Sequence, residues 1–244
     1  DEPRFWLLEL SHLAAPLGVR PGARWVPLRD RAGASICDVG APGALAEEDY
    51  AALLGTARGL ALWHRSVGFC AACGGRTAPC RAGRNRCCVV EGCGARFRPR
   101  LDPSVIVLVV CGRRCLLGRS PRWPAGRFSA LAGFVELGET LEECVAREVL
   151  EEAGVEVARD SLRFVASQPW LFPRSLMSSF IVEAEHQQVT VDPTELQDAR
   201  WFTAEEVREA VDDEVVAAAE GRFHVPSRAS LARTVIEAWL AEVE

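Results

Sequence analysis

The sequence predicts an α+β protein in three parts, and both its composition and its order of motifs support that prediction. Of its 244 residues, 49% are hydrophobic and 25% are charged, as is ordinary for globular domains. Six of the ten cysteines fall between Cys70 and Cys93, and beyond Leu101 patterns typical of strands and helices alternate. We therefore expect a smaller β-rich N-terminal domain (1–66) ending in a helix, a cysteine-rich module (67–100) and a larger domain (101–244).

The individual elements follow from apolar runs and their spacing. Short runs at 5–8 and 25–28 indicate strands, and apolar residues recur at helical spacing from Tyr50 to Trp63. The β-branched run Val105–Cys111 predicts a strand buried on both faces. Further strands are expected at 115–117, 128–135, 162–167 and 177–182. Helices are expected after Thr140, after Thr203 and along the stripe Leu231, Val235 and Trp239.

Charge and hydropathy exclude several classes of protein. The net charge of −6 argues against a broad electrostatic surface for nucleic acid. All 28 basic residues are Arg, which excludes lysine chemistry such as a Schiff base. No run of 18 apolar residues occurs, so we expect no membrane partner and a cytoplasmic protein. The chain begins at Asp1 rather than Met, which leaves a lost organellar targeting segment as an alternative.

One expected helix concentrates carboxylates. Thr140 and Glu143 form a capping box at its start, and a glycine at 154 ends it. Glu148, Glu151 and Glu152 follow at spacings that place all three on one face, where like charges repel. A hard divalent cation offsets that repulsion, because Mg²⁺ prefers carboxylate oxygens and bridges phosphates. We expect the arginine at 147 to pair with the glutamates at 143 and 151 and to hold the face rigid.

The cysteines form two knuckles. Cys70 and Cys73 are separated by two residues, and Cys88 and Cys93 by four. Four thiolates so arranged are typical of a closed, structural zinc site with one Zn²⁺ ion. Buried or disulfide-bonded cysteines are the alternative. Cys87 adjoins Cys88 and is a second candidate for the third ligand position.

Residues 133–155 carry a more specific pattern. They contain Gly, five residues, Glu, seven residues, Arg-Glu, an aliphatic residue, any residue, Glu-Glu, any residue, Gly and an aliphatic residue. This stretch resembles the signature of Nudix hydrolases completely. The resemblance implies an α/β/α sandwich with a mixed sheet, and two to three Mg²⁺ or Mn²⁺ ions. It implies that Glu148 and Glu152 are the main metal ligands, that Glu151 binds metal or activates water, that Glu139 braces the loop, and that the Ala132 carbonyl contacts a metal.

A second motif, Ser167-Gln-Pro-Trp-Leu-Phe-Pro-Arg-Ser175, narrows the substrate. Beside a Nudix signature it resembles the zinc-containing NADH pyrophosphatase (NudC-like) family. The resemblance implies hydrolysis of NADH or NAD⁺ to nicotinamide mononucleotide and AMP, NAD-cap removal from RNA, and a homodimer. It implies that Glu195 is a further metal ligand. The substrate-binding residues that it implies are Arg98, Phe134, Gln168, Pro169, Trp170, Leu171, Phe172, Pro173, Arg174, Ser175 and Ala232.

Two of these positions depart from the family pattern. Arg98 stands where the family usually has Tyr, and Leu171 stands where it usually has Pro. Two other functions stay open on the sequence alone. One is a Nudix pyrophosphatase for ADP-ribose or dinucleoside polyphosphates. The other is a zinc-ribbon nucleic-acid-binding protein with an inactive Nudix domain, which the intact carboxylates and the net charge of −6 disfavour.

Overall fold

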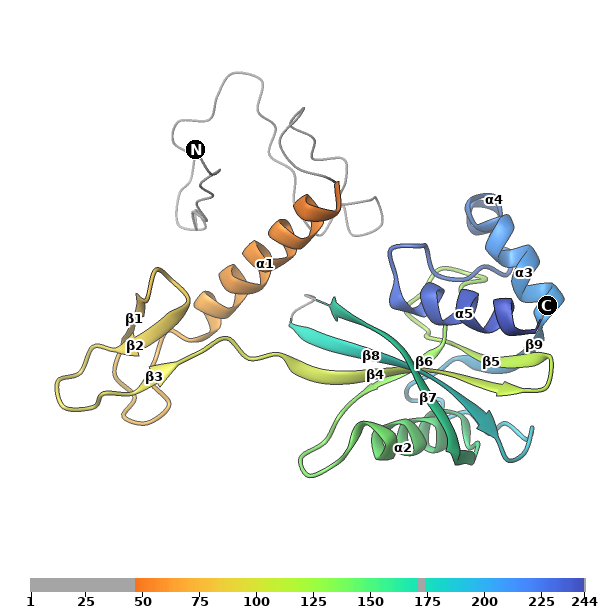
Figure 1. Cartoon of the computed structure of the whole chain (residues 1–244), viewed down its shortest axis with the longest axis horizontal. Helices are drawn as coiled ribbons and strands as arrows, with labels where there is room; N and C mark the ends of the chain where they lie inside the picture. The colour runs from red at the N-terminus through yellow and green to blue at the C-terminus, as the bar shows by residue number, and fades with distance from the viewer. Residues whose placement is uncertain (1–46, 171–173, 244) are drawn as a thin grey trace, which may run out of the picture. The chain divides into compact units, whose positions relative to one another are not determined.

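The computed structural model describes residues 47–170 and 174–243. The chain divides into two compact units, Asp1–Arg100 and Leu101–Glu244 (Figure 1). The expected strands at 5–8 and 25–28 lie outside the described residues. Among the described residues, no helix is long and apolar enough to cross a membrane.

In its described residues, 47–100, the N-terminal unit contains one helix and a small antiparallel sheet in the order β1-β2-β3. Its elements are α1 (Glu47–Ser66), β1 (Thr77–Cys80), β2 (Asn85–Cys88) and β3 (Arg96–Phe97). The end of α1 is fixed to the β1–β2 hairpin, because His64 Nε2 lies 2.7 Å from the Gly83 carbonyl oxygen. Arg86 lies 3.1 Å from His64 Nδ1 and donates to the Thr77 carbonyl at 2.8 Å. The helix expected from Tyr50 to Trp63 is present as α1, and it extends beyond both of these residues.

The C-terminal unit is built on a six-stranded sheet. The strands are β4 (Asp102–Cys111), β5 (Arg114–Arg119), β6 (Leu131–Phe134), β7 (Val157–Trp170), β8 (Ser175–Ala184) and β9 (Asp198–Thr203). Their order is β7-β8-β4-β5-β9, and β6 also pairs with β4. The β4–β8 pair is parallel and the remaining pairs are antiparallel, so the sheet is mixed.

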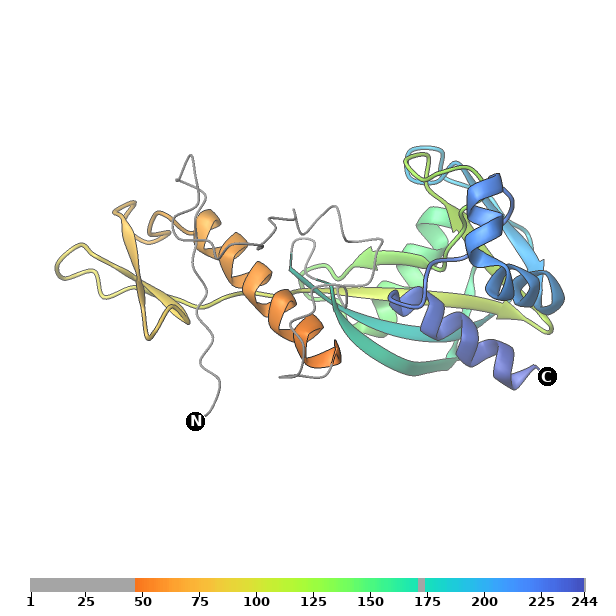
Figure 2. The same cartoon turned by 90° about the horizontal axis from the view of Figure 1, so that it is seen from above.

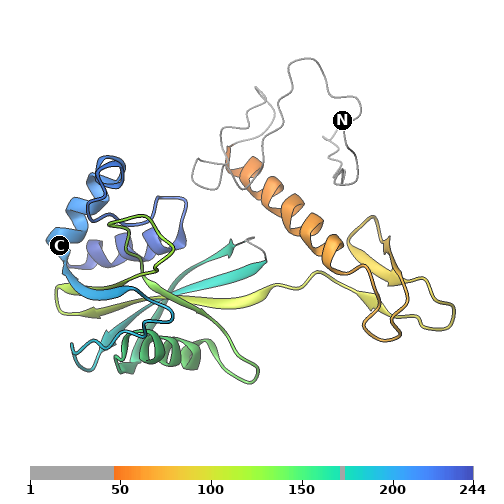
Figure 3. The same cartoon turned by 180° about the vertical axis from the view of Figure 1, so that it is seen from behind.

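Helices cover both faces of this sheet. α2 (Leu141–Ala153) lies on one face, and α5 (Leu231–Glu242) lies on the other, with α3 (Ala204–Asp212) and α4 (Glu214–Glu220) beside it (Figures 1 and 3). From above, α5 runs over the strands that it contacts, β4, β7 and β8 (Figure 2). Alternate residues of β4 enter the two cores, with Val107 on the α2 side and Leu108 on the α5 side. This is the expected α/β/α sandwich.

The strand expected at 128–135 and β9 differ most from the sequence-based expectation, and β7 extends well beyond the expected 162–167. Only Leu131–Phe134 of the strand expected at 128–135 pairs with β4. The preceding residues pair elsewhere: the Phe128 amide donates to the His224 carbonyl, and Ser129 forms a bridge with Gly118. β9 had no expected counterpart, because only two of its six residues, Ala199 and Phe202, are buried.

Candidate functional site

The carboxylate helix forms as its sequence predicts. The Thr140 side chain accepts a hydrogen bond from the Glu143 amide at 3.2 Å, and the Glu143 carboxylate accepts one from the Thr140 amide at 2.9 Å. Gly154 ends α2 in the left-handed conformation, with φ 66°. The capping box is therefore confirmed. Because its carboxylate serves the helix start, Glu143 does not form the expected pair with Arg147.

Three carboxylates converge beside α2. Oxygen atoms of Glu148, Glu152 and Glu195 all lie within 4.8 Å of one another. Glu148 and Glu152 are buried, with 8% and 7% of their surface exposed, and Glu195 is exposed. Glu151 lies outside this cluster: its carboxylate is exposed and accepts a hydrogen bond from Arg147 at 3.1 Å. The structure therefore brings together three of the four glutamates expected to bind metal.

Glu195 reaches the cluster because its loop is fixed to the end of α2. The Thr190 amide donates to the Ala153 carbonyl at 2.8 Å, and the Asp192 amide donates to the Glu152 carbonyl at 3.1 Å. These bonds satisfy carbonyls that a helix end leaves without partners. Thr194 closes a turn by donating its amide to Asp192 Oδ1 at 2.8 Å. The loop thus places Glu195 beside the helix.

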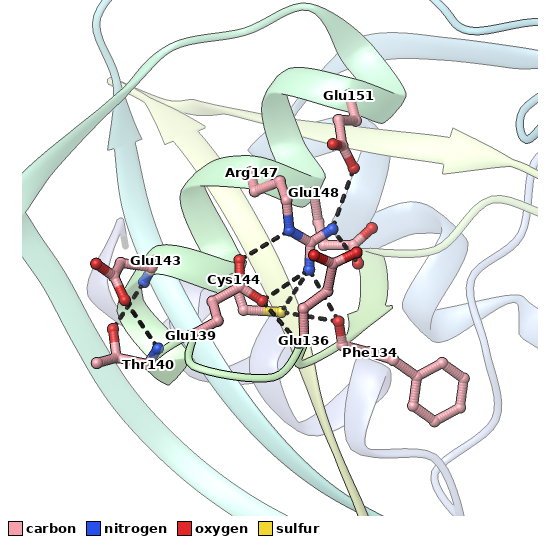
Figure 4. Close-up of polar contacts among 9 residues, drawn as sticks. All are labelled: Phe134, Glu136, Glu139, Thr140, Glu143, Cys144, Arg147, Glu148 and Glu151. Carbon is pink, nitrogen blue, oxygen red and sulfur yellow. Dashed lines mark hydrogen bonds and ion pairs between the residues drawn. The ribbon is translucent and has the colours of Figure 1, made fainter.

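Arg147 connects the loop before α2 to the carboxylate cluster (Figure 4). Its guanidinium forms two hydrogen bonds to the Glu139 carboxylate, at 2.7 and 2.8 Å, and one to Glu148 at 2.9 Å. It also donates to the Phe134 carbonyl at 2.9 Å, while the Phe134 ring points away from this network. The Arg147–Glu139 pair was not predicted, because Glu139 precedes the helix and shows no helical spacing with Arg147.

The hydrogen bonds from Arg147 keep the Glu139 carboxyl group ionised. Hydrogen bonds from Arg147 lower the pKa of this carboxyl to about 2. Glu139 Oε2 also accepts a hydrogen bond from the Glu136 amide at 2.9 Å, across the turn before α2. A charged carboxylate with these partners fits the bracing role that the resemblance implies.

The Nudix signature begins with a glycine, Gly133, because a larger side chain would not fit at this position. A Cβ atom at Gly133 would lie 1.8 Å from Glu148 Cδ. Glycine therefore allows the buried carboxylate to lie directly against β6. The neighbouring Ala132 is paired with Ile106 in the sheet, and its carbonyl as a metal contact remains a prediction.

The carboxylate cluster has the properties of a cation site. Burial, together with the negative charges of Glu148 and Glu195, raises the pKa of Glu152 to about 8. Burial also raises the pKa of Glu148. The buried Oε2 atom of Glu152 has no hydrogen-bond partner, which is costly for a polar atom in a folded protein. A divalent cation with oxygen ligands would remove both costs, so these residues fit Mg²⁺ or Mn²⁺.

Most of the residues expected to bind substrate, those from 168 to 175, lie between the end of β7 and the start of β8. Gln168 donates its amide to the Ala229 carbonyl at 3.0 Å and accepts from the Leu231 amide at 2.9 Å. Its side chain thus fixes the start of α5, where Ala232 is buried. Pro169 and Trp170 are exposed, and Ser175 is buried. Arg174 pairs with Asp102 at 2.9 Å. Leu171, Phe172 and Pro173 lie outside the described residues.

The four cysteines of the two knuckles converge in the N-terminal unit. The sulfurs of Cys70, Cys73, Cys88 and Cys93 lie within 4.8 Å of one another. The Cys70–Cys93 and Cys73–Cys88 sulfur distances are 3.8 and 3.5 Å. Thiolates about 2.3 Å from a tetrahedral Zn²⁺ ion would be about 3.8 Å apart. The cluster can therefore hold a metal ion, and its geometry fits zinc.

Cys87 and Cys88, the two candidates for the third zinc ligand, have different partners in the structure. Cys87 forms a disulfide with Cys80 across the β1–β2 hairpin, and Cys88 is the one of the two neighbours whose sulfur lies in the four-cysteine cluster. The sequence did not reveal this disulfide. It depends on the register of the hairpin, in which Cys80 lies opposite Asn85 and Ala78 lies opposite Cys87. Arg98 follows β3 in the same unit and is exposed; its contact with substrate remains a prediction.

Comparison with known proteins identifies the family. The NUDIX domain model matches residues 100–220. The chain is 39% identical over 232 residues to the NAD-capped RNA hydrolase NudC of Stutzerimonas stutzeri, covering 95% of this chain and 73% of that protein. The chain belongs to the NudC-like branch of the Nudix hydrolases. It is also 40% identical over 202 residues to the human NAD-capped RNA hydrolase NUDT12, covering 80% of this chain.

The match covers only part of the length of some of these relatives. The chain spans 42% of the length of human NUDT12 and 64% of the length of NudC from Pseudomonas syringae, to which it is 42% identical over 198 residues. Among solved structures, a Nudix hydrolase from Nitrosomonas europaea is 21% identical, with a TM-score of 0.49, and the match covers 64% of this chain and 96% of that one.

Proposed function

We propose that this chain hydrolyses the pyrophosphate bond of NADH and NAD⁺, giving nicotinamide mononucleotide and AMP, and removes NAD caps from RNA. The observation that supports this is the cluster that Glu148 and Glu152 of the Nudix helix α2 form with Glu195 of the loop before β9. Relatives that match 80% and 95% of this chain are named as NAD-capped RNA hydrolases. As a further proposal from the family resemblance, the chain acts as a homodimer.

We assign a role in the proposed reaction to each of the glutamates and to Arg147. Glu148, Glu152 and Glu195 would hold two to three Mg²⁺ or Mn²⁺ ions. Bound ions of this kind neutralise phosphoryl oxygens and lower the pKa of water. Arg147 keeps Glu148 in place through its 2.9 Å hydrogen bond. A carboxylate of the site accepts the proton of the attacking water; Glu151, which is exposed and lies on the same helix as Glu148 and Glu152, is the proposed acceptor.

Product analysis tests this proposal. The protein is incubated with Mg²⁺ or Mn²⁺ and, separately, NADH, NAD⁺, ADP-ribose, a diadenosine polyphosphate and NAD-capped RNA. We expect nicotinamide mononucleotide and AMP from the dinucleotides, and RNA with a 5′-monophosphate from the capped RNA. Efficient turnover of ADP-ribose or the diadenosine compound alone would contradict the substrate assignment. RNA binding without turnover of any substrate would contradict the enzymatic assignment.

We propose one structural Zn²⁺ ion at the four-cysteine cluster, and two neighbouring substitutions test it. Cys88→Ser removes a ligand, so the zinc content should fall from about one ion per chain to nearly none. Cys87→Ser breaks the disulfide to Cys80 but leaves the four ligands intact, so zinc should be retained. Zinc is measured by elemental analysis after gel filtration. Loss of zinc in Cys87→Ser with retention in Cys88→Ser would reverse the assignment.

The effect of Mg²⁺ on stability should depend on pH. The pKa of Glu152 is about 8 in the folded protein, against an ordinary value of 4.5. Between these values the folded state keeps a proton that the unfolded state has lost, so the metal-free protein loses stability as pH rises. Mg²⁺ binds the deprotonated form. We therefore expect Mg²⁺ to raise Tm more at about pH 8.5 than at about pH 6. Glu152→Gln should abolish most of this difference.

A further inference from the structure

The two units of the chain carry opposite charge. Residues 67–100 contain seven arginines and one acidic residue, Glu91, giving a formal charge of +6 in a chain whose net charge is −6. Four thiolates with one Zn²⁺ ion would reduce this to +4. Residues 101–244 contain 14 arginines and 25 acidic residues. The C-terminal unit, which we also call the catalytic unit, is therefore anionic, and the short cysteine-rich segment 67–100 is basic.

Most arginines of this segment are available to a ligand. Arg76, Arg81, Arg84, Arg96, Arg98 and Arg100 are exposed, and within the described part of the chain none of them forms an ion pair. Arg86 is the exception, since its guanidinium donates to Thr77 and contacts His64. In the catalytic unit, by contrast, arginines such as Arg113, Arg163 and Arg222 pair with carboxylates.

The β1–β2 hairpin presents two of these arginines in a defined turn. Arg81 and Ala82 have positive φ angles of 51° and 53°, and Gly83 follows with 79°. Such angles are costly for residues other than glycine, and persist where the surrounding structure determines them. The Cys80–Cys87 disulfide and the contact between His64 and the Gly83 carbonyl hold this turn. Arg81 and Arg84 are therefore exposed side chains on a turn whose backbone is held in place.

The same segment exposes an aromatic ring beside a guanidinium. Phe69 is 67% exposed, and Arg76 lies 6.0 Å from the centre of its ring. Phe69 and Arg76 are joined by a β-bridge, so the pair is held together by backbone. Arginines that contact phosphates, combined with an aromatic ring on which a base can stack, are typical of single-strand nucleic-acid binding.

We propose that residues 67–100 bind the phosphate backbone of single-stranded RNA, and so hold the body of a capped RNA substrate. This inference rests on the proposed function, in which capped RNA is a substrate. The charge distribution gives the reason: a catalytic unit with 25 acidic residues and 14 arginines repels a polyanion. A free dinucleotide carries few charges and needs no such surface. Removing Arg84 and Arg96, which are not among the residues expected to bind the dinucleotide, should therefore weaken RNA binding and leave NADH hydrolysis unchanged.

A double variant, Arg84→Gln/Arg96→Gln, tests this. Both side chains are exposed and form no ion pair in the described residues. The probe is a 5′-monophosphate RNA of about 20 unpaired nucleotides, and binding is measured by fluorescence anisotropy over a range of salt concentrations. Loss of two phosphate contacts should reduce the slope of log K against log salt by about 1.4. We expect binding at about 0.1 M salt to weaken at least fivefold, with unchanged zinc content and unchanged kcat/KM for NADH.

The matched control is Arg114→Gln/Arg122→Gln in the catalytic unit, where both arginines are also exposed. It makes the same change in net charge and should bind RNA nearly as the parent does. Equal weakening by the two double variants, or no weakening by the first, would overturn the inference. So would tighter binding to anionic vesicles than to RNA. RNA binding needs no turnover, so a chain that binds RNA through these arginines but cleaves neither NADH nor capped RNA would contradict the proposed function alone.

Discussion

Replacing Glu152 by Gln is expected to lower kcat/KM for NADH by about a thousandfold. The change removes one carboxylate from the cluster with Glu148 and Glu195, and a metal ion in such a site contributes several kcal/mol of transition-state stabilisation. Stability should not fall in parallel, because the substitution removes a buried group whose pKa is raised to about 8 by burial and by neighbouring negative charges. Steady-state kinetics with Mg²⁺, together with Tm in its absence, measure both effects.

Glu142 provides the control on the same helix. It is exposed in the first turn of α2 and lies outside the cluster, so Glu142→Gln should change kcat/KM by less than about twofold. The loss of kcat/KM in Glu151→Gln should lie between the losses in these two variants, since Glu151 pairs with Arg147, which also binds Glu148. If Glu152→Gln retained near-parental activity, the carboxylate cluster could not be the catalytic centre.

Gly133→Ala is expected to lower kcat/KM by about a hundredfold or more while the protein stays folded. The added Cβ would lie 1.8 Å from Glu148 Cδ, well inside normal contact distance, so the carboxylate must move by more than about 1 Å. A displacement of that size at a reacting centre can cost about a hundredfold in rate. Kinetics at saturating Mg²⁺, with Tm as a measure of folding, test this result.

Gly68→Ala is the matched control, because no atom lies within 4 Å of the Cβ position there. Its activity should equal that of the parent. A second test uses metal concentration: if Glu148 is displaced, the Mg²⁺ concentration for half-maximal activity should rise in Gly133→Ala. Parental kinetics in that variant would show that Glu148 does not need its place against β6.

The carboxylate helix was predictable because its signals are local. Thr140 and Glu143 define its start and Gly154 its end, and all three act within one turn of the backbone. The same local spacing predicted that Glu148 and Glu152 share a face. It also placed Glu151 with them. In the structure that carboxylate lies against Arg147 instead, since helical spacing fixes where a side chain starts but not where it ends.

Other features depend on contacts between distant segments. Glu195 was expected only from the family resemblance, because its position depends on a loop bonded to the last carbonyls of α2. The Cys80–Cys87 disulfide depends on strand register, and Arg147–Glu139 depends on how a loop returns to a helix. Gln168 was expected at the substrate from the family resemblance, which stays a prediction, and nothing in the sequence indicated that its amide also bonds to the start of α5. Residue type alone does not distinguish these partners.

The central strand β4 has one more consequence. Its side chains alternate between the layer beneath α2 and the layer beneath α5, as Val107 and Leu108 illustrate. Neither layer can lose its packing without exposing the side chains on one face of the same strand, so the two layers should melt together in a single cooperative transition. The carboxylate cluster beside α2 and the packing of α5 should therefore be lost at the same temperature. A destabilising substitution beneath α5, on the opposite side of the sheet, should then lower activity by lowering the fraction of folded enzyme.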